Sequence, residues 1–321
     1  MKKRIVCTAG MFLFATLCAN AVEAWTGSHG HEMVVIGDVG QGSVDYEYSL
    51  GKYEVTNTQY VEFLNAVGKD AAATYDLYNS KMASHAWVNL DETTGKFYVG
   101  SGYEKVPVGY VTAYAAAYFC NWLSTGDLTK GAYTFSAEKT NKNTQTNFCL
   151  STEQRTGFYV LPTEKELEKG GFYDPTKVNG DGSVGGFWKY ATRTDEDLVD
   201  DVDANFGGND YACDVGTFKP SYYGTYDQSG NVGEWTSTTN DGYDLRYAIG
   251  GNTLSKNSVS LSYELDTGHA CDLGGHYPEW SCHCTGIRLA YVGTIPEPSA
   301  FGLLAGLGAL ALAISRRKRR K

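Results

Sequence analysis

The two ends of the chain most limit what it can fold into, because both carry patterns typical of export rather than of a packed core. Residues 1–24 begin with Lys2-Lys3-Arg4 and continue as an apolar stretch over 5–19 that ends near small residues, the order of a secretory signal peptide. Residues 300–314 form a second run without charge, closed by six Arg and Lys residues over 316–321. The folding unit is therefore expected between the two ends, where about 270 residues are enough for a single domain.

The charge between these ends excludes one class of partner. The whole chain has 27 Lys and Arg against 37 Asp and Glu, but nine of the basic residues and only two of the acidic ones lie in 1–24 and 294–321. The net charge of the body is therefore near −17, against −10 for the whole chain. A body without a basic patch has no cationic groups placed to bind a phosphate backbone, so no nucleic acid is expected among the partners.

Six cysteines remain once residues 1–24 are set aside, and an even number in an exported chain favours disulfides. The candidates for disulfide bonds are Cys149, Cys213, Cys271, Cys282 and Cys284. Cys271 is expected to bond to Cys282 or Cys284, although the histidines near these cysteines would also suit zinc. Cys120 lies in a helical pattern and is interpreted as a small buried hydrophobic residue.

Three segments carry the start signals of helices. Each begins after a threonine that can cap the first turn, and these are Thr56, Thr112 and Thr163. The first and the third are capping boxes, with Gln or Glu three residues later. The first helix is expected to stop at Gly68 and the second near Gly126, because glycine commonly follows a helix.

The rest of the body predicts short strands and long loops. Residues 33–37 and 44–55 are expected to form an opening hairpin with Gly51 at its turn. Residues 178–184 resemble part of an EF-hand loop, but Lys177 would occupy the first position, where an acidic ligand is needed. A solvated hairpin turn is expected there instead. Three helices amid irregular β structure indicate an α+β domain with few helices, short strands and much loop.

Five motifs follow one another along the body in a recognisable order. They are Gly51-Lys52-Tyr53-Glu54-Val55-Thr56-Asn57, Val106-Pro107-Val108, Leu161-Pro162-Thr163-Glu164, Gly230-Asn231-Val232-Gly233-Glu234-Trp235, and Gly250-Gly251 with Gly286-Ile287-Arg288-Leu289-Ala290. In this order they resemble the sulfatase-modifying-factor family, whose founding activity is the formylglycine-generating enzyme. The resemblance covers about residues 33–292. It implies a C-type-lectin-like α+β fold with calcium-stabilised loops, and we assign this domain to residues 25–293.

The resemblance also implies a catalytic site from which this sequence departs. In the family oxidase, two cysteines after a Gly-Gly-Ser motif bind Cu(I), and the metal activates dioxygen to convert a substrate cysteine to formylglycine. Counted from Gly250-Gly251, these positions are Ser255 and Ser260, and no cysteine lies between Cys213 and Cys271. Cu(I) requires soft sulfur ligands, which a serine hydroxyl does not replace. We therefore expect no copper and no catalytic residues.

A structural calcium ion is a second property that the resemblance implies. Carried over by position, its ligands would be the side chains of Asp227 and Glu234 and the carbonyls of Gly230 and Val232. Hard oxygen ligands from one loop suit Ca²⁺. The alternative is a tight turn with Glu234 in a buried salt bridge. A second calcium site of the family maps onto Asn205 and Phe206.

The end of the chain resembles a known sorting signal. Pro296-Glu297-Pro298, a small-residue apolar run and a terminal basic cluster occur in the order of the PEP-CTERM signal, which we assign to residues 294–321. The resemblance implies a Gram-negative bacterium, a precursor anchored transiently in the inner membrane by a transmembrane segment at 299–315, and cleavage by an exosortase. Release to the cell envelope or extracellular matrix would follow. An ordinary C-terminal anchor is the alternative.

Together these features favour an exported, non-catalytic, lectin-like protein that binds a glycan, such as an extracellular polysaccharide, or an envelope protein. The expected ligand surface is 252–277, which is rich in Asn, Ser, Tyr and His. The residues expected to contact the ligand are Asn252, Ser255, Asn257, Ser260 and Tyr263. A formylglycine-generating-type oxidase is the alternative, and a matrix component without a discrete ligand is the third hypothesis.

Overall fold

The computed structural model describes most of the body of the chain. The described residues are 23–85, 87–135, 148–149, 155–207, 211–239, 246–251, 253 and 281–294. Among them, no helix is both long enough and apolar enough to span a membrane. The predicted transmembrane segment at 299–315 and the predicted signal peptide, apart from its last two residues, lie outside the described part.

The three longest helices of the described chain begin where the threonine caps predict. They are α1 (Asn57–Val67), α4 (Ala113–Thr125) and α6 (Glu164–Phe172). The hydroxyl oxygens of Thr56, Thr112 and Thr163 accept hydrogen bonds from backbone amides of the first turns, and the first and third helices have complete capping boxes. Both predicted stops are confirmed, because Gly68 follows α1 and Gly126 follows α4. The shorter helices are η1 (Ser28–Gly30), α2 (Lys69–Thr74) and α3 (Met82–His85).

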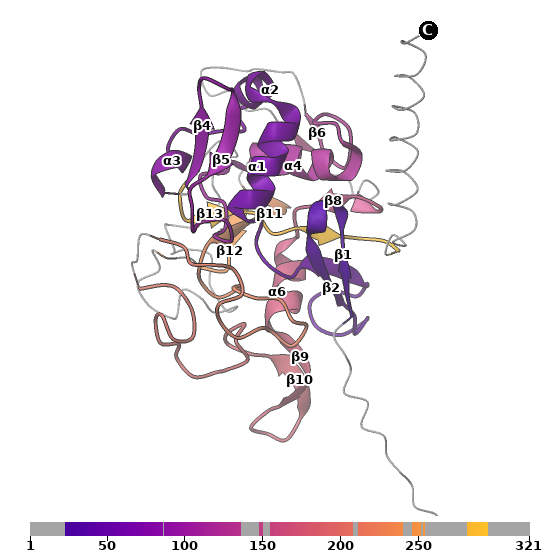
Figure 1. The fold of residues 1–321 in the computed structure, drawn as a ribbon. Coiled ribbons are helices and arrows are strands. Elements are labelled where there is room, and N and C mark those ends of the chain that lie inside the picture. Colours follow the sequence, from indigo (N-terminus) through magenta and orange to yellow (C-terminus); the bar gives the residue numbers. More distant parts are fainter. Residues whose placement is uncertain are drawn as a thin grey trace, which may run out of the picture.

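A five-stranded antiparallel sheet brings the two ends of the domain together. Its order is β1 (Ala24–Thr26), β2 (Glu32–Ile36), β3 (Tyr48–Gly51), β14 (Ala290–Tyr291) and β8 (Tyr159–Val160). Leu50 is central, opposite Val34 on one side and Ala290 on the other. In Figure 1 the yellow C-terminal segment lies beside the indigo N-terminal strands.

The predicted opening hairpin is correct in its pairing and wrong in its turn. Strands β2 and β3 pair antiparallel, but Gly51 ends β3 opposite Met33 instead of forming the turn. Its amide donates to the carbonyl of Leu289 at 2.7 Å. A Cβ atom at this position would lie 2.9 Å from the carbonyl oxygen of Tyr53. Glycine is therefore required for a close approach of backbones rather than for a turn.

The remaining strands form small sheets around this frame. They are β11 (Gly233–Thr239) between β12 (Arg246–Ile249) and β13 (Thr285–Gly286), and the pairs β4 (Val88–Asp91) with β5 (Lys96–Val99), β6 (Thr134–Phe135) with β7 (Phe148–Cys149), and β9 (Tyr173–Val178) with β10 (Val184–Phe187). The predicted hairpin turn at 178–184 is confirmed as the connection between β9 and β10. The fold is thus α+β, with few helices, short strands and much loop, as predicted.

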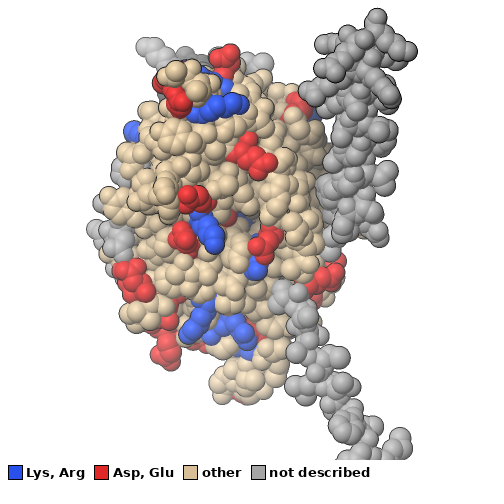
Figure 2. All heavy atoms as spheres, in the orientation of Figure 1, with Lys and Arg blue, Asp and Glu red and all other residues tan. Residues whose placement is uncertain are grey.

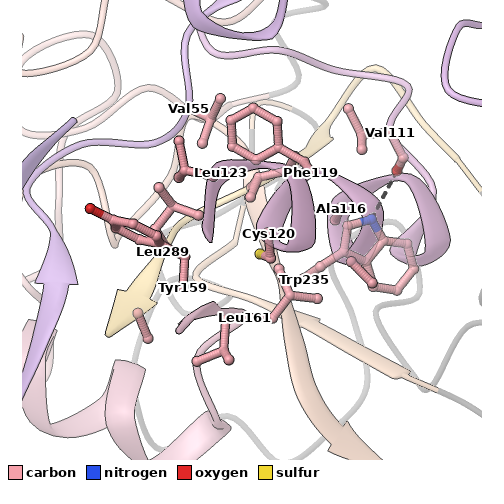
Figure 3. Close-up of a cluster of buried hydrophobic side chains, with 14 of the residues drawn as sticks. Val55, Val111, Ala116, Phe119, Cys120, Leu123, Tyr159, Leu161, Trp235 and Leu289 are labelled. Atoms are coloured by element: carbon pink, nitrogen blue, oxygen red, sulfur yellow. Dashed lines mark hydrogen bonds between the residues drawn. The ribbon is translucent and has the colours of Figure 1, made fainter. Parts of the chain in front are cut away.

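The hydrophobic core is built around α4. Residues 113–123 of this helix are all buried, so it has no solvated face. The side chain of Phe119 lies toward Val55 and that of Cys120 toward Trp235, within one cluster of buried side chains (Figure 3). The indole Nε1 of Trp235 donates to the carbonyl of Val111 at 2.8 Å, which satisfies the polar atom of a fully buried ring. The Cys120 thiol is free and buried, as predicted.

Candidate functional site

Much of the predicted ligand surface lies outside the described residues. The two serines at the family copper positions, Ser255 and Ser260, are in this group, as are Asn252, Asn257 and Tyr263. Their contribution to a ligand site stays a prediction. The predicted calcium residues, in contrast, are all described, and they lead to a buried cluster of charged groups.

The loop over 227–234, which leads into β11, is buried throughout. Asp227 and Asn231 have left-handed backbone conformations, with φ of 62° and 59°. Gly230 has φ of 108°, and a Cβ there would lie 2.6 Å from the carbonyl oxygen of Asn205. Aspartate, asparagine and glycine are the residues that tolerate positive φ best. The sequence therefore specifies a tightly wound loop that faces the protein interior.

The two predicted calcium segments meet at this loop. The amide of Asn231 donates to the carbonyl of Asn205 at 2.9 Å, and the side-chain amide of Asn205 donates to Asn231 Oδ1 at 3.3 Å. The amide of Phe206 donates to Asp200 Oδ1 at 2.9 Å. These bonds use groups of Asn205 and Phe206 to hold the loops together. A calcium ion at Asn205 and Phe206 stays a prediction.

Arg288 is the centre of the charged cluster. Its guanidinium is fully buried and donates twice to Glu234 Oε1, at 2.9 Å from Nε and 2.7 Å from Nη2. It also donates to the carbonyls of Gly51 at 3.0 Å, Lys52 at 3.3 Å and Tyr226 at 2.7 Å. One side chain therefore joins the end of β3, the loop before β11 and the segment before β14. The alternative expected from the sequence, that Glu234 forms a buried salt bridge, is therefore present in the structure.

Two further carboxyl groups surround the same arginine without comparable partners. Asp227 accepts a hydrogen bond from the amide of Gly216 through Oδ2 at 2.6 Å. Among the described residues, no group donates to its buried Oδ1 or to either buried oxygen of Glu54. Buried carboxyl oxygens normally have hydrogen-bond partners, and their absence costs free energy. The cluster thus has three carboxyl groups for one guanidinium.

Burial controls the protonation of these acids. Desolvation raises the pKa of Glu54 well above its usual value, and the nearby Asp227 raises it further, against the opposing effect of Arg288. Burial also raises the pKa of Asp227, and it raises that of Glu234 to about 7 even beside Arg288. The site therefore favours either a proton or a bound cation at the carboxyl groups that Arg288 does not neutralise.

A small cavity of about 30 Å³ opens beside Glu54. It is also lined by His31, whose buried Nε2 has no hydrogen-bond partner among the described residues. Burial lowers the pKa of His31 to about 4, with a further contribution from His29, so the ring is neutral at pH 7. A polar cavity of this size accommodates one or two water molecules. The cavity thus lies next to Glu54, whose carboxyl oxygens are themselves buried.

The cysteine predictions require correction. Cys282 is bonded to Cys284, with Cα atoms 5.1 Å apart, so neither is bonded to Cys271 as predicted. Cys213 is a free thiol, so its assignment as a disulfide candidate was also wrong. Burial raises its pKa to about 12. The side chains of Cys149 and Cys271 lie outside the described part, and the described residues contain no cluster of three or more His, Cys, Asp or Glu that could hold a metal.

Sequence reasoning located Asp227 and Glu234 but missed Glu54 and Arg288. Both missed residues lie within the motifs quoted for the family resemblance, each beside apolar neighbours such as Val55 and Ile287. A charged residue between buried apolar residues needs a partner. That pattern was the available signal, although it does not identify the partner.

Comparison with family models gives two matches that together cover nearly the whole body and the end of the chain. The model described as sulfatase-modifying factor enzyme 1-like domain matches residues 27–289. The PEP-CTERM protein-sorting motif matches residues 294–320. Both resemblances proposed from the sequence are confirmed.

A curated relative matches a smaller part of the chain. The serine/threonine-protein kinase pkn1 of Chlamydia caviae is 25% identical over 190 residues, which are 59% of this chain and 22% of that protein. This chain therefore spans about a fifth of the length of that relative.

Solved structures with a similar fold cover most of the chain. CarF is 20% identical, with a TM-score of 0.51, over 81% of this chain and 97% of its own. Treponema denticola variable protein 1 is 20% identical over 84% and 98%, with a TM-score of 0.49. PvdO from Pseudomonas aeruginosa is 16% identical over 84% and 97%, with a TM-score of 0.47. The likeness to CarF concerns the fold alone.

Proposed function

Because the chain belongs to the family of the sulfatase-modifying factor enzyme 1-like domain, we propose that it is a non-catalytic member that binds a glycan outside the cytoplasm. Its PEP-CTERM signal marks it as an exported protein of the cell envelope and is consistent with processing by an exosortase. Family membership gives the scaffold, whereas the function depends on the residues placed on it. The proposal therefore depends on which of the family's reactive groups this chain retains.

The absence of suitable thiols carries the non-catalytic part of the proposal. No cysteine lies between Cys213 and Cys271 in the sequence, where the family's copper ligands would occur. Among the described cysteines whose side chains are placed, Cys282 and Cys284 are joined in a disulfide, and Cys120 is buried in the core. Burial raises the pKa of the thiols of both Cys120 and Cys213. These residues do not fit a Cu(I) centre, because the metal needs accessible thiolates.

Binding of a glycan is supported by location and charge. The protein is exported to the envelope, and its acidic sequence disfavours polyanionic partners. On the face in Figure 2, charged side chains form small separated groups on a largely uncharged surface. The test is retention of the full-length protein on matrix polysaccharide, with saturable binding expected. Retention only by an envelope protein, or no retention by either, would contradict the proposal.

We also propose that two carboxyl groups of the charged cluster, those of Asp227 and Glu54, bind a structural calcium ion together with backbone carbonyls of the loop over 227–234. Asp227 fits this role because Oδ1 is buried and has no partner among the described residues, and the carbonyls of Gly230 and Val232 belong to the same loop. Glu54 fits for the same reason as Asp227. Glu234 fits less well, because Arg288 donates two hydrogen bonds to its Oε1. Carboxylate and carbonyl oxygens are the ligands that Ca²⁺ prefers.

Calcium addition to EDTA-treated protein tests this assignment. An ion present at 100 times its dissociation constant would stabilise the native state by about 2.7 kcal/mol, and the melting temperature should rise accordingly. Asp227→Asn should remove the response. Asp181→Asn is the matched control, because Asp181 lies in the exposed EF-hand-like turn and accepts hydrogen bonds from Ser183. An unchanged melting temperature of the wild type, or loss of the response in Asp181→Asn instead, would contradict the assignment.

A further inference from the structure

Three aromatic rings, two from residues that flank β4 and β5 and one from a distant loop, form a stack at the surface of the domain. The rings of Trp87 and Tyr103 are parallel within 6°, with centroids 3.9 Å apart. The ring of Tyr211 contacts Trp87 at 5.5 Å with an interplanar angle of 43°. We call Trp87, Tyr103 and Tyr211 the aromatic stack.

The backbone holds each ring of the stack in place. Two donors, the amide of Gly100 and the side-chain amide of Asn89, each bond to the carbonyl of Trp87 at 3.0 Å. The side chain of Asn57 at the start of α1 donates to the carbonyl of Tyr103 at 3.0 Å. The carbonyl of Tyr211 likewise accepts from Asn205 Nδ2 at 3.0 Å. Hydrogen bonds thus hold the backbone that carries each ring, and an ordered backbone lowers the entropy lost when a ligand binds.

The backbone of Trp87 is strained. Its φ is +57°, in the left-handed region that bulky side chains rarely adopt. Such a conformation persists where the surrounding structure imposes it, often at ligand sites. This strained residue lies just before β4, and its indole stacks on Tyr103.

The exposure of the stack separates it from the aromatic contacts of the core. Tyr118 and Phe135 form another parallel pair, also with centroids 3.9 Å apart, but Tyr118 is buried in the main core. In the aromatic stack, Tyr211 is 56% exposed, and Trp87 and Tyr103 are only partly buried. Exposed aromatic rings gain little from the hydrophobic effect in the free protein. Their arrangement therefore suits a surface that a ligand covers.

The geometry of the stack selects the ligand. Trp87 and Tyr103 are in van der Waals contact, so no cation fits between them as in an aromatic cage. Nucleic-acid bases would stack on such rings, but they require basic groups for the phosphates, and the body is acidic. The electron-rich faces of the rings attract the weakly positive C–H groups of a sugar ring. Exposed Ser101 and Glu104, in the loop of Tyr103, offer polar groups for sugar hydroxyls.

From this geometry we infer that the aromatic stack is a subsite for an uncharged sugar residue of a polysaccharide. The inference rests on the proposed function, because it assigns a place and a chemical class to the glycan. It differs from the sequence prediction, which placed the ligand on residues 252–277.

Binding of the full-length protein to cellohexaose, mannohexaose and dextran, with an oligogalacturonate as the anionic comparison, tests the inference. Calorimetry and tryptophan fluorescence should both report binding to at least one neutral probe. Tyr211→Ala should weaken that binding by about tenfold or more, as loss of one stacking ring predicts. Tyr211→Phe keeps the ring and should bind within about threefold of the wild type.

Tyr98→Ala is the matched control, because Tyr98 is a 51% exposed tyrosine on β5 outside the stack. This variant should bind like the wild type, and circular dichroism should show all variants folded. If the wild type binds a neutral probe and Tyr211→Ala binds equally well, the inference is overturned while the proposed function remains. If the wild type binds only the oligogalacturonate, the inference is also overturned, because the subsite is assigned to an uncharged sugar. If it binds no glycan at all, the proposed function fails and the subsite with it.

Discussion

The core around α4 and the charged cluster around Arg288 are both buried, but they are stabilised in different ways. In the core, apolar side chains surround α4, and the one polar atom of Trp235 has its partner. In the cluster, the single guanidinium of Arg288 lies among Glu54, Asp227 and Glu234, and buried carboxyl oxygens remain without donors among the described residues. The core needs nothing beyond the chain itself. The cluster, in contrast, favours a proton or a cation at the carboxyl groups that Arg288 does not neutralise.

Replacement of Arg288 should have the largest effect on stability. Arg288→Met removes the cation that the described residues place in the cluster, and with it five hydrogen bonds that join three segments. Loss of one partner of a buried ion pair costs about 3–5 kcal/mol, and urea denaturation at pH 8 measures this cost. Because protonation of the carboxyl groups removes the unpaired charge, the cost should be smaller at pH 5.

Two variants serve as controls for Arg288→Met. Leu161→Ala should cost about 2–5 kcal/mol at either pH, because it leaves a cavity in an uncharged core. Arg193→Met removes a half-exposed arginine near Asp174 and should cost less than about 1 kcal/mol. If Arg288→Met lowered the free energy of unfolding by less than Arg193→Met does, the cluster would not stabilise the fold.

Replacement of Glu54 should have an intermediate effect with a defined pH dependence. The pKa of Glu54 is raised in the folded state, so its contribution to stability is greatest below its unfolded pKa and falls as the pH rises above that value. Glu54→Gln resembles the protonated form. In EDTA it should match the wild type near pH 4 and exceed its stability by about 1–3 kcal/mol at pH 8. An equal difference at both pH values would contradict the role assigned to burial.

Replacement of His31 should give a smaller effect of opposite sign. Burial lowers the pKa of His31 to about 4, so its contribution is complete above its usual pKa and is lost as the pH falls toward 4. The stability of the wild type relative to His31→Gln should therefore fall between about pH 6.5 and pH 4. Urea denaturation across this range checks the sign. If the wild type instead became more stable relative to His31→Gln as the pH fell, the prediction would be wrong, because the folded state would then favour the protonated ring.

The sequence predicted elements whose signals are local. Thr56, Thr112 and Thr163 mark three helix starts, because a cap and its amide are three residues apart. The position of Gly51 was misjudged, because its role depends on Leu289, which is far away in the sequence. The two-residue strand β14 is defined by its pairing with β3 on one side and β8 on the other, and β8 by its pairing with β14. No local pattern could indicate them.

The site shows the same difference between residues that are close in the sequence and contacts that only the fold creates. Asp227 and Glu234 share one loop, so their spacing was visible in the sequence. Arg288 is 54 residues from Glu234 and 237 from Gly51, and only the fold shows that it contacts both. The pairing of Cys282 with Cys284 was missed because six cysteines allow too many combinations.

One measurement tests most directly the proposal that this family member does not carry out copper chemistry. Non-reduced full-length protein is loaded with Cu(I), freed of unbound metal, and incubated in air with a Cys-X-Pro-X-Arg peptide, with Cys282→Ser/Cys284→Ser as a control for thiols released from the disulfide. Mass spectrometry should find only unmodified peptide, and the protein should retain no stoichiometric copper. Turnover to formylglycine with one tightly held copper ion per chain would contradict the claim.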